Sequence, residues 1–211
     1  MNKIILIGGP PRSGKTTLAQ KVSSELNIPW ISTDAFDDIA KGYVSEADRD
    51  ILFPKSALRR KSGGGNDKMY STFQTSEIVE AYLKQAETIH SAIKSFVDCA
   101  NTEGWDYVIE GYHITPKLIS TLSVENQNIL SIMLVSTNGD EVIDRSKESN
   151  TKQDWLRDNT KNQETFGKVS KMVTLFSNKI NEEAKEFNVK VIDTSENFAV
   201  RSEEALNHLI K

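Results

Sequence analysis

The stretch "IGGPPRSGKTT", residues 7–17, decides the fold of this chain. It follows the apolar run Ile4 to Ile7 and precedes a segment in which Leu18, Val22 and Leu26 recur at four-residue spacing. Adjacent glycines and prolines interrupt any regular element. The pattern therefore predicts a buried strand over 3–8, a tight turn, and a helix from Lys15.

The turn matches the phosphate-loop pattern G-x-x-x-x-G-K-[ST], in the strand-before, helix-after context that this pattern requires. In such a loop the backbone N–H groups and the helix N-terminus surround phosphate oxygens. We expect Lys15 to contact the β- and γ-phosphates of a nucleotide and the Thr16 hydroxyl to ligate the Mg²⁺ that bridges them. The predicted nucleotide-binding residues are Gly9, Pro10, Pro11, Arg12, Ser13, Gly14, Lys15, Thr16 and Thr17.

The rest of the chain alternates apolar strands with helix-period segments. Further strands are expected at 29–33, 105–110, 128–135 and 189–193, and helices at 78–100, 138–145, 166–187 and 202–210. This alternation predicts one α/β domain over 1–211, with three α/β/α layers and a mainly parallel sheet of about five strands. Ligands of such sheets bind beyond the carboxyl ends of the strands.

Residues 36–74 show no sustained period and include Gly63 to Gly65, three consecutive glycines that are costly to hold in one conformation. We interpret the segment as a mobile insert or lid; a plain flexible surface loop is the alternative. It carries a basic patch, Lys55, Arg59, Arg60 and Lys61, which either contacts an anionic ligand or is a solvated charge run.

Composition narrows the class of protein. The chain has 211 residues, a net charge of −4 and one cysteine, Cys99, which excludes an intrachain disulfide and a Cys-based zinc site. The charge argues against a broad nucleic-acid surface. No apolar run is long enough to span a membrane, and the N-terminal run is too short for a signal peptide, so we expect a cytoplasmic protein. The sequence does not indicate an oligomeric state.

Acidic side chains follow two of the predicted strands. Asp34 comes after "WIST", where a carboxylate could take a proton from an acceptor hydroxyl; the alternative is a helix N-cap. Glu110 ends "VIE" and could hold Mg²⁺ or contact the substrate, or be a plain strand-end acid. His113 lies on the same rim, as an acceptor contact or as a structural histidine.

Together these motifs resemble a P-loop kinase of the small-molecule branch. "GGPPRSGKTTLA" resembles its phosphate loop, "ISTDAF" the strand and acid of its hydroxyl-phosphorylating members, and "VIEGYHITP" the strand of uridine-kinase-like and 2-phosphoglycerate-kinase-like proteins. "LVSTNGDEVIDR" looks like the approach to an arginine-bearing lid, here about 145–160, and "VIDTS" like the loop under the adenine.

The resemblance implies that Lys15 and Asp34 are catalytic, with Asp34 as the base and with Arg145 and Arg157 as lid arginines. Surface arginines without a role are the alternative for these two, and Arg12 is a further candidate cation. The chain departs from adenylate-type kinases, because "EGYHITP" lacks their arginine after the third strand and Arg145 and Arg157 stand apart.

The absence of an arginine after the third strand indicates which chemical group accepts the phosphoryl group. A phosphate acceptor needs cations, whereas a hydroxyl acceptor gains from a nearby carboxylate such as Asp34. The sequence thus predicts an Mg·ATP-dependent phosphotransferase that acts on a hydroxyl of a small metabolite, and the basic patch would suit an anionic one.

Two other functions stay open. One is a nucleotide kinase or a toxin-like kinase acting on a sugar nucleotide. The other is an ATP-binding regulator without transfer chemistry. A guanine-reading switch is disfavoured, because neither "NK" pair of the chain belongs to an N-K-x-D segment after a strand.

Overall fold

The computed structural model describes residues 2–148 and 154–210. Within these ranges five strands form one sheet in the order β2-β3-β1-β4-β5, and every neighbouring pair is parallel. The strands are β1 (Ile4–Gly8), β2 (Trp30–Ser32), β3 (Tyr107–Gly111), β4 (Ile129–Val135) and β5 (Val191–Asp193). Each lies within two residues of a predicted strand at both ends.

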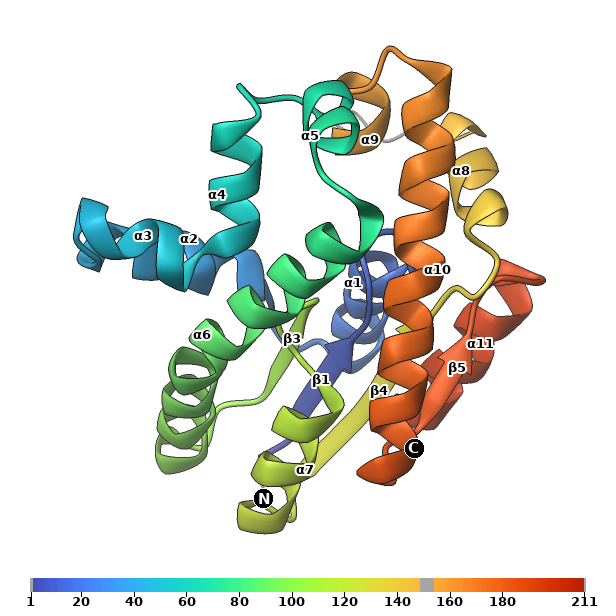
Figure 1. Ribbon diagram of the computed structural model, residues 1–211. Helices are drawn as coiled ribbons and strands as arrows, with labels where there is room; N and C mark the ends of the chain where they lie inside the picture. The colour runs from blue at the N-terminus through green and yellow to red at the C-terminus, as the bar shows by residue number, and fades with distance from the viewer. Residues whose placement is uncertain (1, 149–153, 211) are drawn as a thin grey trace.

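Strand β1 shows why both faces of the sheet are covered. Side chains alternate between faces along a strand, and Ile4 and Leu6 join one apolar cluster while Ile5 and Ile7 join another. The first cluster includes residues of α6 (Thr75–Glu103), α7 (Pro116–Glu125) and α10 (Gln163–Glu186), and the second includes residues of α1 (Lys15–Leu26) and α11 (Phe198–Leu209) (Figure 1). The predicted three-layer α/β/α fold is confirmed.

The longer helices follow the predicted apolar stripes. They are α1 (Lys15–Leu26), α6 (Thr75–Glu103), α8 (Gly139–Glu148), α10 (Gln163–Glu186) and α11 (Phe198–Leu209). Helix α11 begins four residues before the predicted start at Ser202, and α7 (Pro116–Glu125) was not predicted. In α7, Pro116 occupies the first turn and the Thr115 side chain caps the helix. The segment "ITP" is therefore the start of a helix.

The structure of residues 36–74 is more regular than their aperiodic sequence predicts. They are largely helical: α2 (Thr33–Tyr43), α3 (Glu46–Leu52), α4 (Pro54–Lys61) and α5 (Asn66–Thr72). The buried side chains of Phe53, Met69 and Tyr70 attach this segment to the main core. These helices lie beyond the carboxyl ends of the strands (Figure 1), and so they wall the region where ligands of parallel sheets bind.

The glycine run explains the turn between α4 and α5. Gly63, Gly64 and Gly65 all have φ between 75° and 82°, a left-handed conformation that residues with a Cβ rarely adopt. In the structure the three glycines therefore form a turn of defined backbone conformation that links α4 to α5. No helix in the described ranges is long and apolar enough to cross a bilayer.

Candidate active site

The phosphate loop joins the carboxyl end of β1 to α1, as predicted. Gly14 is the N-cap of α1 with φ 94°, and a Cβ there would come within 2.5 Å of the Phe198 ring. No side chain caps this helix, and its first turn carries no acidic residue. The first N–H groups of a twelve-residue helix are thus available to an anion.

Lys15 is almost fully buried at the base of this loop, and its Nζ donates a hydrogen bond to the Pro10 carbonyl at 2.7 Å. Burial lowers the pKa of Lys15, and the negative charges of Glu110 and Asp34 oppose that shift. Both carboxylates therefore lie close enough to act on the lysine. A buried cation in this position gains most from an anionic partner.

Thr16 and Glu110 form the oxygen pair expected of a magnesium site. The Thr16 hydroxyl donates to Glu110 Oε1 at 3.1 Å, although β3 and α1 are far apart in sequence. Burial raises the pKa of Glu110, and Lys15 and the Thr16 hydroxyl oppose it. Mg²⁺ prefers oxygen ligands and is held by one or two carboxylates together with phosphates, so the residues present fit this ion.

Arg12 connects the phosphate loop to the segment predicted as a lid. It has φ 70°, and its Nη1 lies 2.6 Å from Asp154 Oδ2. Asp154 is buried and caps α9 (Trp155–Asp158) by accepting from the N–H groups of Leu156 and Arg157. Of the predicted lid, residues 149–153 lie outside the described residues.

The two predicted lid arginines occupy different places. Arg145 stacks on the Phe198 ring at 4.5 Å and donates from Nη1 to the Thr194 carbonyl at 2.6 Å. Its Nη2 is buried without a hydrogen-bond partner in the described structure, and burial lowers the pKa of Arg145. Arg157 contacts Asp158 through Nε at 3.1 Å.

A cavity of about 880 Å³ opens in front of the phosphate loop. Among the predicted site residues it is lined by Pro11, Arg12, Gly14, Lys15, Thr16, Thr17, Asp34, Glu110 and Arg145. Gly9, Pro10, Ser13, His113 and Arg157 are outside that lining. Lining residues that sequence reasoning missed include Gln20, Trp30, Tyr82, Tyr112, Trp155 and Phe198.

Asp34 lies in the first turn of α2 rather than at its cap. The Ser32 hydroxyl caps this helix by accepting from the Asp34 N–H at 3.3 Å, and the Asp34 carboxylate lines the cavity, with its Oδ1 4.0 Å from His113 Nδ1. Its negative charge acts on both Lys15 and Lys55. The helix that follows "WIST" was not predicted, but the N-cap alternative for Asp34 is excluded.

The basic patch divides between two faces of α4. Lys55 and Arg59, one turn apart, line the cavity, and Lys55 Nζ lies 5.3 Å from the Tyr82 ring centre and 5.8 Å from that of Tyr112. Arg60 and Lys61 instead pair with Asp50. Burial lowers the pKa of Lys55. Within the described residues no carboxylate forms an ion pair with Lys55.

His113 does not reach the cavity, in contrast to the predicted acceptor contact. Its side chain is fully buried, and its Nδ1 lies 2.8 Å from the Thr33 hydroxyl. The preceding residue, Tyr112, lines the cavity and packs against the His113 ring at 3.8 Å. The "GYH" rim therefore contributes its tyrosine to the cavity and its histidine to the support behind it.

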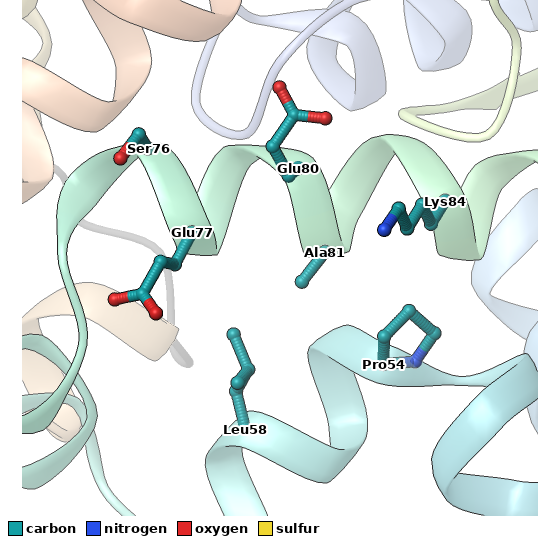
Figure 2. A pocket seen from close by; sticks show the side chains of 7 residues that line it. All are labelled: Pro54, Leu58, Ser76, Glu77, Glu80, Ala81 and Lys84. Atoms are coloured by element: carbon teal, nitrogen blue, oxygen red, sulfur yellow. The ribbon is translucent and has the colours of Figure 1, made fainter.

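A smaller cavity of about 340 Å³ lies between α4 and the start of α6 (Figure 2). It contains none of the predicted site residues, and its acidic groups already have partners. Glu77 accepts from the Gln74 N–H at the N-terminus of α6, and Glu80 pairs with Lys179. The cavity at the phosphate loop is therefore the stronger candidate.

Comparison with known proteins finds a family match over the N-terminal part of the chain. Residues 5–88 match the model of the ATPase family associated with various cellular activities (AAA), a segment that contains the phosphate loop, α2 and α4. Over this segment the chain is similar to ATPases of that family. The described parallel sheet, with a phosphate loop between β1 and α1, is a P-loop fold.

Several curated proteins that are similar to this chain are named 2-phosphoglycerate kinases. A 2-phosphoglycerate kinase of Methanothermobacter thermautotrophicus is 28% identical over 156 residues, which are 73% of this chain and 49% of the relative. A 2-phosphoglycerate kinase of Methanococcus vannielii is 29% identical over 138 residues, 62% of this chain and 42% of the relative. The matches thus span less than half the length of these relatives.

A solved structure supports the fold of the P-loop protein over its whole length. The structure of an unliganded sugar kinase from Janibacter sp. HTCC2649 superposes with a TM-score of 0.51 at 15% identity. The match covers 99% of this chain and 95% of that chain. At this level of identity the likeness establishes the fold, and the chemistry must be argued from the residues of the cavity.

Proposed function

We propose that this protein is an Mg·ATP-dependent phosphotransferase that transfers the γ-phosphoryl group to a hydroxyl of a small metabolite. One observation carries the proposal: the Asp34 carboxylate lines the same cavity as Lys15 of the phosphate loop and Lys55 of α4, and its negative charge acts on both lysines. A donor site and an acceptor site on either side of a carboxylate are the arrangement that phosphoryl transfer to a hydroxyl requires.

On the nucleotide side, the N–H groups at the start of α1 and the Lys15 ammonium would bind the β- and γ-phosphates. Thr16 and Glu110 would hold Mg²⁺, which when bound neutralises charge on the phosphate oxygens. Arg145 and Phe198 form a flat wall beside the loop after β5, suited to the base of the nucleotide. We keep Arg12, Arg145 and Arg157 as candidate cations for the transferring phosphoryl group.

On the acceptor side, Asp34 would accept the proton of the substrate hydroxyl. The hydroxyl oxygen then bonds to the γ-phosphorus, the bond from that phosphorus to the bridging oxygen breaks, and ADP leaves with the electron pair. The Asp34 carboxylate is mostly exposed to the cavity, so an acceptor can approach it directly.

Lys55 and Arg59 favour an acceptor that carries an acidic group. Both face the cavity, while the neighbouring Arg60 and Lys61 share an ion pair with Asp50. A half-buried lysine beside a pair of tyrosine rings, without an ion-pair partner in the described structure, binds a carboxylate or a phosphate with a charge-assisted hydrogen bond. A metabolite with a hydroxyl and an acidic group could donate its hydroxyl proton to Asp34 and bind its acidic group to Lys55.

The test is ADP formation from ATP with three acceptors of graded charge: 2-phosphoglycerate, glycerate and glycerol, with and without Mg²⁺. We expect Mg²⁺-dependent stimulation that is stronger for the anionic acceptors than for glycerol. Stimulation by nucleoside monophosphates or sugar nucleotides instead would favour a nucleotide or sugar-nucleotide kinase. Tight ATP binding without stimulation by any acceptor would contradict the proposal and favour a regulator.

A further inference from the structure

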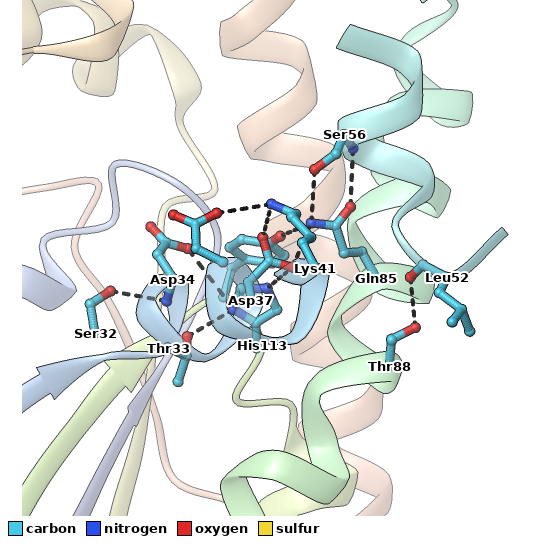
Figure 3. A network of polar contacts seen from close by, with 12 residues as sticks. Ser32, Thr33, Asp34, Asp37, Lys41, Leu52, Ser56, Gln85, Thr88 and His113 are labelled. Atoms are coloured by element: carbon cyan, nitrogen blue, oxygen red, sulfur yellow. Dashed lines mark hydrogen bonds and ion pairs between the residues drawn. The ribbon is translucent and has the colours of Figure 1, made fainter. Parts of the chain in front are cut away.

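Gln85 joins Ser56 of α4 to the polar network around Asp37 of α2 (Figure 3). Its side chain is fully buried on α6. Its Nε2 lies 3.0 Å from Asp37 Oδ1, 3.1 Å from the Tyr112 hydroxyl and 3.3 Å from the Ser56 hydroxyl, and its Oε1 accepts from the Ser56 N–H at 3.0 Å. One amide thus joins α2, α4 and the loop after β3 to α6.

The network leads to Asp34 through α2. Asp37 lies one turn after Asp34 on this helix and is almost fully buried. It accepts from Lys41 as well as from Gln85, and His113 Nε2 lies 3.7 Å from its Oδ1. Burial alone would raise the pKa of Asp37, but the contacts with His113 and Lys41 hold that pKa below its usual value. Asp37 is therefore an ionised acceptor, and Gln85 must donate to it.

The same network leads to the basic side chains through α4. Ser56 follows Lys55 directly in the chain, and both its N–H and its hydroxyl contact Gln85. Gln85 also contacts Tyr112, whose ring lies beneath the Lys55 ammonium. The position of Lys55 relative to Asp34 thus depends on one side chain that touches neither residue.

We infer that Gln85 is a positioning residue, which fixes the helix carrying Asp34 against the helix carrying Lys55 and so sets the orientation of the acceptor. This inference rests on the proposed function. Rates of transfer are sensitive to such placement, since a displacement of about 1 Å far from the chemistry can lower a rate by about 10²-fold. The nucleotide side shares none of these contacts.

Replacement Gln85→Leu keeps an apolar body of similar size and removes the hydrogen bonds. We expect kcat to fall by about 10²-fold and the KM of the acceptor to rise, with the KM of ATP unchanged. The acceptor is the one that gives the largest stimulation among 2-phosphoglycerate, glycerate and glycerol. Circular dichroism and thermal melting of the same samples report whether the variant is folded.

Replacement Gln85→Glu separates positioning from packing. The introduced carboxyl group, when ionised, faces the Asp37 carboxylate and repels it, whereas the protonated form can donate to Asp37 as the amide does and still accept from Ser56. The ratio of the kcat of this variant to that of the wild type should therefore rise as the pH is lowered. Asp37, Lys41, Lys55, Tyr112 and His113 are the ionisable groups around this position, and they are present in both proteins.

Thr88→Val is the matched control, because Thr88 lies on α6 one turn after Gln85. Its hydroxyl donates to the Leu52 carbonyl at 2.8 Å, so it also ties α6 to the α3–α4 segment, but it contacts no member of the network around Asp37 (Figure 3). We expect its kcat and acceptor KM to match those of the wild type.

The outcomes are distinct. Wild-type kinetics in folded Gln85→Leu, or a Gln85→Glu ratio that does not change with pH, would overturn the positioning role while leaving the proposed function intact. Losses in Thr88→Val as large as those in Gln85→Leu would show a general structural effect and would also overturn it. If the wild type phosphorylates none of the three acceptors, the proposed function fails and this inference fails with it.

Discussion

The two sides of the cavity are built in different ways. The nucleotide side comes from one continuous segment, Gly9 to Thr17, in which backbone N–H groups and one buried lysine point toward the same place. The acceptor side is assembled from side chains of α2, α4, α6 and the loop after β3, and Asp34, Lys55, Tyr82 and Tyr112 are far apart in the sequence.

This difference follows from what each side binds. A triphosphate presents the same oxygens in every nucleotide, so a local backbone conformation is sufficient to recognise it. An acceptor is recognised by the spacing of particular charges and hydroxyls, and that spacing exists only after helices pack. The nucleotide side can therefore be recognised in the sequence as a motif, whereas the acceptor side depends on tertiary contacts such as those of Gln85.

The largest effect should come from the nucleotide side. Lys15→Ala removes a buried cation, and we expect ATP affinity to fall by at least about 10²-fold, because a buried charged contact is worth several kcal/mol. Titration calorimetry with ATP measures it. Lys21→Ala, on the exposed face of the same helix, is the control and should bind ATP as the wild type does. Equal affinities for the two variants would contradict the placement of the phosphates at Lys15.

A smaller effect, confined to the acceptor, should come from α4. Lys55→Met and Arg59→Met should each raise the KM of an anionic acceptor by about 10- to 100-fold, the value of one lost charge-assisted hydrogen bond. The KM of ATP should stay unchanged. Arg60→Gln and Lys61→Gln are the matched controls, because these side chains face Asp50. Equal effects from all four variants would mean that overall charge, rather than a specific contact, attracts the acceptor.

The smallest effect concerns His90, which lies on α6 with its Nε2 3.4 Å from the Thr115 hydroxyl. Burial lowers the pKa of His90 to about 4, below its ordinary value of 6.5, so the unfolded chain binds a proton more readily than the folded one. Stability is therefore complete above pH 6.5 and is lost as the pH falls toward 4, by about 2 kcal/mol after allowance for partial exposure.

Urea unfolding of His90→Gln at pH 7 and pH 5 tests this. The variant should lose less stability between the two pH values than the wild type does. His208→Gln, at an exposed position on α11, should show the wild-type dependence. A dependence that is the same in all three proteins would show that His90 does not carry it.

The strands and the phosphate loop could be predicted because their signals are local. Apolar β-forming runs mark the strands, and Gly14, Lys15 and Thr16 stand at fixed spacing. Helices α3 and α4 escaped prediction for a physical reason. They are short, and the described structure buries no residue of α3 and only Ala57 of α4, so no apolar period develops.

Only those residues of the candidate site that carry a local sequence signal could be predicted. Asp34 and Glu110 follow strands, so their meeting at one edge of the sheet was predictable from the topology. Tyr82 belongs to the apolar stripe of α6 and Tyr112 to a loop, and neither position differs in sequence from an ordinary core residue. The burial of His113 behind Tyr112 likewise depends on the packing of α2 against β3.

The central claim, that the Asp34 carboxylate is the base that accepts the proton of the acceptor hydroxyl, is tested most directly by replacing Asp34. Single-turnover transfer from ATP to the acceptor, followed by ³¹P NMR, should be slower by about 10²- to 10⁴-fold in Asp34→Asn, while ATP affinity stays close to that of the wild type. Asp38→Asn, one turn along α2 and exposed to solvent, is the control. Full transfer by Asp34→Asn would contradict the assignment of Asp34 as the base.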